Sequence, residues 1–422
     1  MSSLPPHLPS DHPIFTQFNS LPIMTPPSYS APYYVSRSSK QTGVDLFKKL
    51  ILMSAQNPGV IPIIQKMAFD RQGYSLYKTT SGGWTPLMIA CKNARTASTD
   101  AVVNILIQAG SITINAKNKN GRTALSLACE VSNEDSTERT VQMLLRAGAD
   151  PNLLNLKKES PLTWACQYSG TTSTENTVRM LIQAKAKLDI QNSTGVTALI
   201  LAAKNSGILS TENTVRILIE AGANLNIANI HGWTALHSAA TNSGTLSTEN
   251  TVRILIDAGA DLDLQTKEGG TALIMAVMYS RTKSTENTVW ILIQSGANLD
   301  IQTPDGWTAL MYACKYANTE STEGTLQLLI QGGANPNLVN NRGKTALGIY
   351  LGTLYNPMIV EFMLQFGAKL SQYDVIPDDL YLKQLLLQYY RDDLTMAHHI
   401  IGNNPELLRY FTTLTVPGSL YP

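Results

Sequence analysis

The sequence predicts an all-α repeat protein in which a unit of two helices recurs along the chain. Three observations predict this class. A short motif returns at a fixed spacing, helix-capping residues hold fixed places in each copy, and apolar residues follow at helical spacing. With 422 residues, the chain is long enough for one such array or for two or three ordinary domains.

The motif consists of a threonine or serine, then alanine or proline, then leucine. Its first interval, from Thr85 to Thr123, is 38 residues, and each of the six later intervals is 37 residues. A spacing kept over so many copies is not a product of chance. The eight copies begin at Thr85, Thr123, Ser160, Thr197, Thr234, Thr271, Thr308 and Thr345.

Residues 195–231 illustrate one copy. We expect Thr197 to cap a first helix, and Ser210 to cap a second helix with Glu212 in its first turn. Gly222 follows as a left-handed residue that ends the second helix. The stripe expected to be buried on this helix consists of Val215, Leu218 and Ile219.

The common pattern of the copies is Gly-x-Thr-(Ala/Pro)-Leu-x-x-Ala-(Ala/Cys), followed by Leu-Ile-x-Ala-Gly-Ala-Asn-(Leu/Ile)-Asn. This pattern resembles the ankyrin repeat. The resemblance covers about residues 83–369 and extends back to residue 43 through a degenerate copy. It implies an ankyrin-repeat solenoid of paired antiparallel helices joined by short β-hairpin turns, and it implies the family's usual role in protein binding.

Two features depart from the family pattern. The family period is about 33 residues, and the extra residues of this chain fall between the two helices, as in 207–210. The family's histidine after Thr-Pro-Leu remains only as His237. Most copies therefore lack the residue that supports the family's usual hydrogen-bond network.

The third copy differs further from the others. Lys158 replaces the turn glycine, and Lys185 replaces the glycine that follows the second helix. If the backbone keeps a positive φ at these places, each lysine costs about 1 kcal/mol. We therefore predict that the third repeat is the least stable inner repeat.

The copies divide the chain into four regions. Residues 1–40 contain eight prolines, and we expect a disordered Pro/Ser-rich tail. Residues 43–80 are predicted to form a degenerate N-terminal capping repeat, 81–369 eight ankyrin repeats, and 370–422 a helical C-terminal cap. The helices expected in the C-terminal cap run from Asp378 to Tyr390 and onward from Asn404.

The four cysteines share one repeat position, directly after an alanine. Equivalent positions in adjacent repeats should lie about 8–10 Å apart, whereas a disulfide needs Cα atoms within about 7 Å. We therefore expect buried free thiols, consistent with an intracellular location in the cytoplasm or nucleus. The four residues are Cys91, Cys129, Cys166 and Cys314.

Composition and motifs argue against several function classes. A net charge of +1 offers no basic excess for nucleic acid, and no run of 18 apolar residues predicts a membrane span. The six histidines have no zinc-ligand spacing with cysteine, and no glycine-rich loop has phosphate-binding spacing. We expect no enzyme activity, no cofactor, no metal and a monomeric chain.

The resemblance also predicts where a partner binds, since hairpin tips and the exposed face of the first helix form the family's concave binding surface. At these positions the residues vary among copies, and Trp and Tyr dominate binding hot spots. An alternative is that the tryptophans brace neighbouring turns. The predicted partner-binding residues are Trp84, Tyr168, His231, Trp233, Tyr279, Trp307, Lys315 and Tyr316.

A Ser-Thr-Glu-Asn string recurs almost unchanged before each second helix, for example at 173–176 and 210–213. It either caps that helix or forms a second binding stripe.

The sequence thus predicts a non-catalytic scaffold that binds a protein on the concave face of the array. The near-identical inner copies resemble in style the ankyrin arrays of large DNA viruses of amoebae, which implies a host protein as partner. One alternative is a substrate receptor of a ubiquitin ligase, with 370–422 recruiting the ligase. Another is a structural spacer without a dedicated partner.

Overall fold

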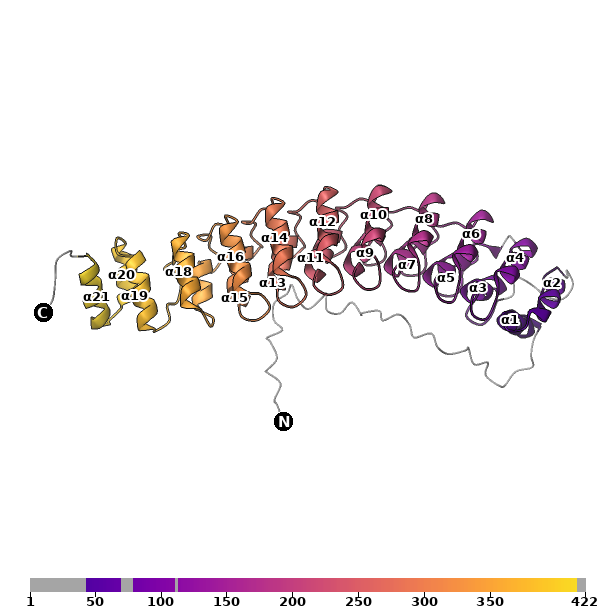
Figure 1. The fold of residues 1–422 in the computed structure, drawn as a ribbon, viewed down its shortest axis with the longest axis horizontal. Helices are drawn as coiled ribbons and strands as arrows, with labels where there is room; N and C mark the ends of the chain where they lie inside the picture. The colour runs from indigo at the N-terminus through magenta and orange to yellow at the C-terminus, as the bar shows by residue number, and fades with distance from the viewer. Residues whose placement is uncertain (1–42, 70–78, 111–112, 416–422) are drawn as a thin grey trace, which may run out of the picture. The chain divides into compact units, whose positions relative to one another are not determined.

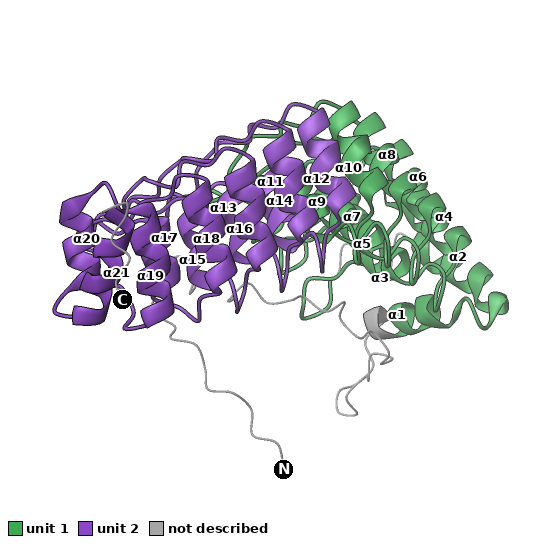
Figure 2. Ribbon diagram, turned by 60° about the vertical axis from the view of Figure 1, so that its left-hand side comes forward, with its two compact units in different colours: residues 1–235 green, residues 236–422 purple. Residues whose placement is uncertain are grey.

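A computed structural model of the chain describes residues 43–69, 79–110 and 113–415, so the predicted tail at 1–40 lies outside it (Figure 1). Within the described ranges every regular element is a helix and no strand occurs, which confirms the all-α prediction. None of these helices is both long enough and apolar enough to cross a membrane. The chain divides into two compact units, residues 1–235 and 236–422 (Figure 2).

The first unit stacks helix pairs one upon the next. The first helices α3, α5, α7 and α9 contact one another in sequence, and so do the second helices α4, α6, α8 and α10. The helices are α1 (Gly43–Met53), a 3₁₀ turn (Pro58–Val60), α2 (Ile61–Phe69), α3 (Pro86–Lys92), α4 (Asp100–Ala109), α5 (Ala124–Glu130), α6 (Glu138–Arg146), α7 (Pro161–Gln167), α8 (Glu175–Gln183), α9 (Ala198–Asn205) and α10 (Glu212–Glu220).

The second unit, which begins within α11, repeats the arrangement. Helices α13, α15 and α17 form one row of contacts, and α12, α14 and α16 form the other. The helices are α11 (Ala235–Asn242), α12 (Glu249–Asp257), α13 (Ala272–Met278), α14 (Glu286–Gln294), α15 (Ala309–Tyr316), α16 (Glu323–Gln331), α17 (Ala346–Leu351), α18 (Pro357–Gln365), α19 (Leu380–Tyr389), α20 (Leu394–Ile401) and α21 (Pro405–Thr415).

The first helices begin at the threonines of the motif. The Thr197 hydroxyl accepts a hydrogen bond from the Ile200 amide at 3.3 Å, as a helix N-cap does. The second helices begin one residue later than the sequence predicted. Thr211, not Ser210, caps α10, because its hydroxyl is the one that accepts from the Thr214 amide, at 3.0 Å.

The buried stripe of α10 is also wider than the helical spacing predicted. Val215 and Leu218 are buried as expected, but Ile217 is buried in place of Ile219, which is partly exposed. The helix packs against both α9 and α8, so two of its sides are covered rather than one. Burial on two sides is the normal state of a second helix inside such a stack.

Left-handed residues close the turns and the second helices. Gly222 has a φ of 91°, and the turn glycine Gly195 has a φ of 77°. Lys158 and Lys185 keep the same conformation, with φ values of 60° and 65°. The backbone condition behind the predicted weakness of the third repeat is therefore met, since side chains with a Cβ are strained in this region. The ranking of the repeat stabilities stays a prediction.

The turns are closed by backbone hydrogen bonds without forming strands among the described residues. The Asn192 amide donates to the Val196 carbonyl at 3.0 Å, and the Gly195 amide donates to the Asn192 carbonyl at 2.9 Å. The Ile230 amide of the next turn donates to the Thr194 carbonyl at 3.1 Å. Successive turns are thus joined to one another as well as closed.

All four cysteines are buried and unpaired, as the repeat position predicted. Burial in an apolar environment raises the pKa of each thiol well above its usual range. These thiols are therefore packing groups that stay protonated at neutral pH.

His237 is buried in α11, and its Nε2 lies 3.1 Å from the Gly270 carbonyl of the following turn. Burial lowers the pKa of this imidazole to about 4, although backbone hydrogen bonds oppose the shift. The His237 imidazole is therefore uncharged at neutral pH, and in that form it bonds to the neighbouring turn.

The two ends continue the stack with different residues. Helix α1 contacts α3, and α2 contacts α4, as a capping repeat would. Residues 70–78 of the predicted N-terminal cap lie outside the described residues. Towards the other end, α19 and α21 fall where helices were expected, whereas α20 was not predicted. The boundaries of the four regions stay predictions.

Candidate partner-binding surface

The second helices form an edge that is bonded in the same way at successive repeats. The Glu175 carboxylate accepts hydrogen bonds from the Thr211 hydroxyl and the Asn213 amide of the next repeat. Glu138 accepts in the same way from Thr174 at 2.5 Å and from Asn176 at 2.6 Å. In the second unit, Glu249 accepts from Thr285 and Asn287.

A second row of hydrogen bonds lies beneath this edge and is buried. The Ser169 hydroxyl is 3.0 Å from that of Ser210 and also bonds to Thr214. The same pairing joins Ser132 to Ser173, Ser243 to Ser284, and Ser280 to Ser321, at 3.0–3.2 Å. Since every residue type of the Ser-Thr-Glu-Asn string bonds to a neighbouring repeat, these contacts favour the structural interpretation of the string.

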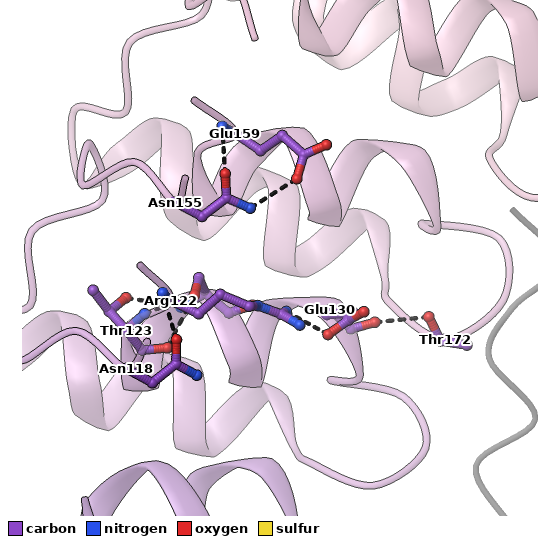
Figure 3. Close-up of polar contacts among 8 residues, drawn as sticks. Asn118, Arg122, Thr123, Glu130, Asn155, Glu159 and Thr172 are labelled. Carbon is purple, nitrogen blue, oxygen red and sulfur yellow. Dashed lines mark hydrogen bonds and ion pairs between the residues drawn. The ribbon is translucent and has the colours of Figure 1, made fainter. Parts of the chain in front are cut away.

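Asparagine side chains fix the turns that precede the first helices. The Asn118 side-chain oxygen accepts from the Arg122 amide at 2.9 Å, and Asn155 accepts in the same way from the Glu159 amide at 2.9 Å (Figure 3). The residue before each capping threonine is therefore held in place by its backbone. Its side chain remains free to differ among repeats.

In the first unit, Arg122 forms a largely buried ion pair on the face formed by the turns and the first helices, which is called the face below. Its guanidinium bonds to the Glu130 carboxylate, and the two side chains are only 14% and 5% exposed (Figure 3). The guanidinium carbon also lies 4.8 Å from the centre of the Trp164 ring. The Glu130 carbonyl accepts from the Thr172 hydroxyl at 2.7 Å, which fixes the end of α5.

Other aromatic residues on the face of the first unit also contact neighbouring side chains. The Trp164 and Tyr168 rings stack with centres 6.0 Å apart. The Lys92 ammonium lies 5.6 Å from the centre of the Trp84 ring. Burial lowers the pKa of Lys92, while the Glu130 charge opposes that shift.

In the second unit, Trp307, Lys315 and Tyr316 form one cluster over the buried ring of Tyr312. The Lys315 ammonium lies 5.2 Å from the Trp307 ring centre and 5.1 Å from that of Tyr316. Tyr312 lies 5.1 Å from Trp307 and stacks on Tyr316 at 6.4 Å between ring centres. This cluster is called the Trp307 cluster below.

Tyr279 is the C-cap residue of the preceding first helix, α13, with the Lys283 ammonium 4.9 Å from its ring centre. Burial raises the pKa of both Tyr279 and Tyr316, and the Glu320 charge raises each further. Both phenols therefore stay protonated over the physiological range and can donate a hydrogen bond to a partner.

The structure places the eight predicted residues in two groups by exposure. Tyr168 and Trp233 are buried, at 2% and 4% exposed. The others are partly exposed, and three of them meet in the Trp307 cluster. The partly exposed residues are Trp84, His231, Tyr279, Trp307, Lys315 and Tyr316. Their role in binding stays a prediction.

Several residues at the ends of the first helices are buried, although the resemblance implies an exposed face on these helices. The loop after each first helix covers them, because it is bonded to the loop of the next repeat, as the Asn133 amide is to the Thr172 carbonyl at 3.0 Å. The buried residues are Glu130, Val131, Tyr168, Asn205, Thr241, Asn242 and Met278.

Sequence reasoning did not select Trp164 or Tyr312 as parts of this face. Both lie four residues before another aromatic residue, Tyr168 and Tyr316 respectively, and a spacing of four places side chains on one side of a helix. That spacing is the signal that could have identified them.

The sequence was compared with known families and structures. The family description "Ankyrin repeats (3 copies)" matches residues 51–138, 131–229, 173–264, 209–286 and 280–374, which together span more than half of the chain. The chain belongs to the ankyrin repeat family. Ankyrin repeats generally mediate protein–protein interactions, and the proteins that contain them are typically non-catalytic adaptors.

Two solved ankyrin structures are similar to this ankyrin chain. The ankyrin repeat domain of Bcl-3, a member of the IkappaB protein family, is 25% identical, with 58% of this chain and 98% of that chain covered at a TM-score of 0.47. The human ASB11 ankyrin repeat domain is 22% identical, with 59% and 100% covered at a TM-score of 0.47. No curated protein sequence matched significantly.

Proposed function

We propose that this ankyrin protein is a non-catalytic scaffold that binds a protein partner on the face formed by its turns and first helices. The observation that carries the proposal is the contrast between this face and the edge of the second helices. The edge repeats the same Ser, Thr, Glu and Asn contacts, whereas the side chains of the face vary among repeats.

The composition of the face supports this role. Partly exposed Trp and Tyr side chains offer a large contact area with little rotamer entropy to lose on binding. Cations already lie over several of these rings, as Lys315 does over Trp307. A face whose side chains are held in place before binding loses less entropy when a partner arrives.

The experiment is to capture partners with the tagged full-length chain, identify them by mass spectrometry, and measure the affinity of a purified partner for variants. The double variant Tyr279→Ala and Tyr316→Ala should weaken binding by about tenfold or more, since truncating an aromatic hot spot typically costs about 2 kcal/mol.

Trp290→Ala provides the matched control. Trp290 is an exposed tryptophan of the second helix α14, on the edge rather than the face, with Arg253 5.8 Å from its ring centre. Binding that survives the tyrosine substitutions unchanged removes both tyrosines from the interface. Binding lost on Trp290→Ala alone places the partner on the edge and contradicts the proposal.

A second candidate function is recruitment of a further protein, such as ubiquitin-ligase machinery, by residues 370–422. Large apolar side chains are exposed there, including Tyr373 at 59%, Val375 at 68% and Tyr381 at 62%. Truncation at residue 370 should then abolish co-purification of ligase subunits and spare the partner bound by the repeats. A chain with no reproducible partner in proximity labelling would instead be a structural spacer.

We also propose that the protein works inside cells, in the cytoplasm or nucleus, and that its partner is a host protein if the array is viral. Four buried thiols suit a reducing compartment. Imaging of the tagged chain tests the location directly.

A further inference from the structure

Repeats 1 and 7 carry the same pair of side chains at the same positions. Trp84 precedes the capping threonine of repeat 1, and Lys92 ends its first helix; Trp307 and Lys315 hold these places in repeat 7. In both repeats the lysine ammonium lies over the indole ring, at 5.6 Å and 5.2 Å from its centre. The two sites therefore share their aromatic and cationic parts.

The repeats that follow them differ in charge at one of two equivalent positions. After repeat 1 come Arg122 and Glu130, and the Glu130 carboxylate bonds to Arg122 while its charge favours the protonated form of Lys92. After repeat 7, the equivalent positions hold Lys344 and Gly352. Repeat 8 therefore keeps a cation, Lys344, at the position of Arg122. It has no carboxylate at the position of Glu130.

The cations at the Trp307 cluster are not paired in the way that Arg122 is. Burial lowers the pKa of Lys315, and the nearby positive charge of Arg342 lowers it further. In the described part of the chain, no carboxylate forms an ion pair with Lys315, Arg342 or Lys344. Two acidic groups lie near the rings. The Asp305 charge helps to raise the pKa of Tyr312, and the Glu320 carboxylate, which acts on Tyr316, accepts from the Thr282 hydroxyl at 2.9 Å.

The cluster also offers an apolar floor beside this charge. Tyr312 is 1% exposed and contacts both the Trp307 and Tyr316 rings, so the two outer rings rest on a packed base. A ligand that fits would bring one negative group to Lys315 and an apolar group to the rings.

We propose that the Trp307 cluster binds an aspartate or glutamate side chain of a protein partner, next to an apolar side chain of the same segment. The partner carboxylate takes the place of Glu130 in repeat 2, with Lys344, at the position of Arg122, and Lys315, at the position of Lys92, as its donors and Arg342 nearby. This inference rests on the proposed function and adds the chemistry of the partner segment.

The test uses phage-displayed random 12-residue peptides panned against the full-length protein. The recovered peptides should be enriched in Asp or Glu adjacent to an aromatic or aliphatic residue. Their affinity, measured by fluorescence anisotropy of the labelled peptide, should fall about tenfold with Lys315→Gln, as for loss of one charge-assisted contact.

Gly352→Glu is a gain-of-charge test of the same site. A Cβ at Gly352 would lie 3.3 Å from the Ile349 carbonyl, and the backbone φ of −78° accepts any L residue. The new carboxylate occupies the position of Glu130 and should compete with the peptide, which also lowers affinity about tenfold. Circular dichroism of each variant checks that the helices are retained.

Lys92→Gln is the matched control, because it alters the same tryptophan–lysine pair beside an internal carboxylate, and it should leave the affinity unchanged. If neutral or basic peptides bind, and Trp307→Ala abolishes their binding, the acidic-segment inference is overturned while the proposed function is sustained. Acidic peptides that bind Lys315→Gln and Gly352→Glu as tightly as the wild type would also overturn the inference. Recovery of no peptide, or of peptides insensitive to every face substitution, contradicts the proposed function as well.

Discussion

The edge of the second helices and the face of the first helices follow opposite rules. Along the edge, Glu138, Glu175 and Glu249 make the same two contacts with the next repeat. On the face, the residue before the capping threonine is Trp84 in one repeat and Arg122 in the next. The difference teaches that the repeats keep their invariant contacts with one another separate from the variable side chains of the face.

The largest expected effect tests the limit of this separation, because here a residue of a first helix, His237, contributes to stability. The pKa of His237 is about 4 in the folded chain and 6.5 without burial. Between these values the unfolded chain binds more protons, so stability falls as the pH drops from 6.5 to 4. His237→Gln should reduce the stability lost between pH 7 and pH 4 by about 3 kcal/mol, measured by guanidinium unfolding at both pH values. An unchanged pH dependence would contradict a buried neutral imidazole.

The next largest effect tests the edge itself. Ser169→Ala removes a buried hydroxyl that bonds to Ser210 and Thr214, and leaves a buried donor without its partner. We expect a loss of about 2 kcal/mol in unfolding free energy. Gln167→Ala, two residues earlier and partly exposed, should change stability by less than about 0.5 kcal/mol. Equal losses in the two variants would show that edge and face do not differ in this way.

The smallest effect sharpens the comparison within the first unit. Lys158→Gly and Lys185→Gly should each stabilise the third repeat by about 1 kcal/mol, because glycine is unstrained at positive φ. Hydrogen exchange should show the third repeat as the least protected inner repeat in the wild type and not in the double variant. Lys157→Gly is the control, since Lys157 lies outside the left-handed region and should gain nothing. Uniform protection across repeats 2 to 5 in the wild type would refute the ranking.

Much of the fold could be predicted because its signals are local. Thr197 and Gly222 mark a helix start and a helix end through their own backbone preferences. The shift from Ser210 to Thr211 could not be predicted in this way, since both residues cap helices well and only the bond from Ser210 to Ser169 decides between them. Helix α20 was missed although Asp393 caps it, with its carboxylate 3.0 Å from the Met396 amide.

The candidate surface was less predictable, because exposure depends on the next repeat. The register of the motif identified Trp307 and Lys315 as face positions, and the structure brings them together. The same register also selected Tyr168, which the surrounding loops bury. The ion pair of Arg122 with Glu130 joins a turn residue to the last residue of α5, and a helical pattern does not relate the two because Arg122 lies before the helix.

The ladder of Thr and Glu contacts has a consequence for how this protein can change over generations. Glu138 bonds to Thr174 and Glu175 bonds to Thr211, so deleting one whole period would bring Thr211 to the place of Thr174. The new junction would have the same donor and acceptor as the old one. Unequal recombination can thus alter the copy number of the inner repeats while keeping these hydrogen bonds at the new junction, and each change lengthens or shortens the surface offered to other molecules.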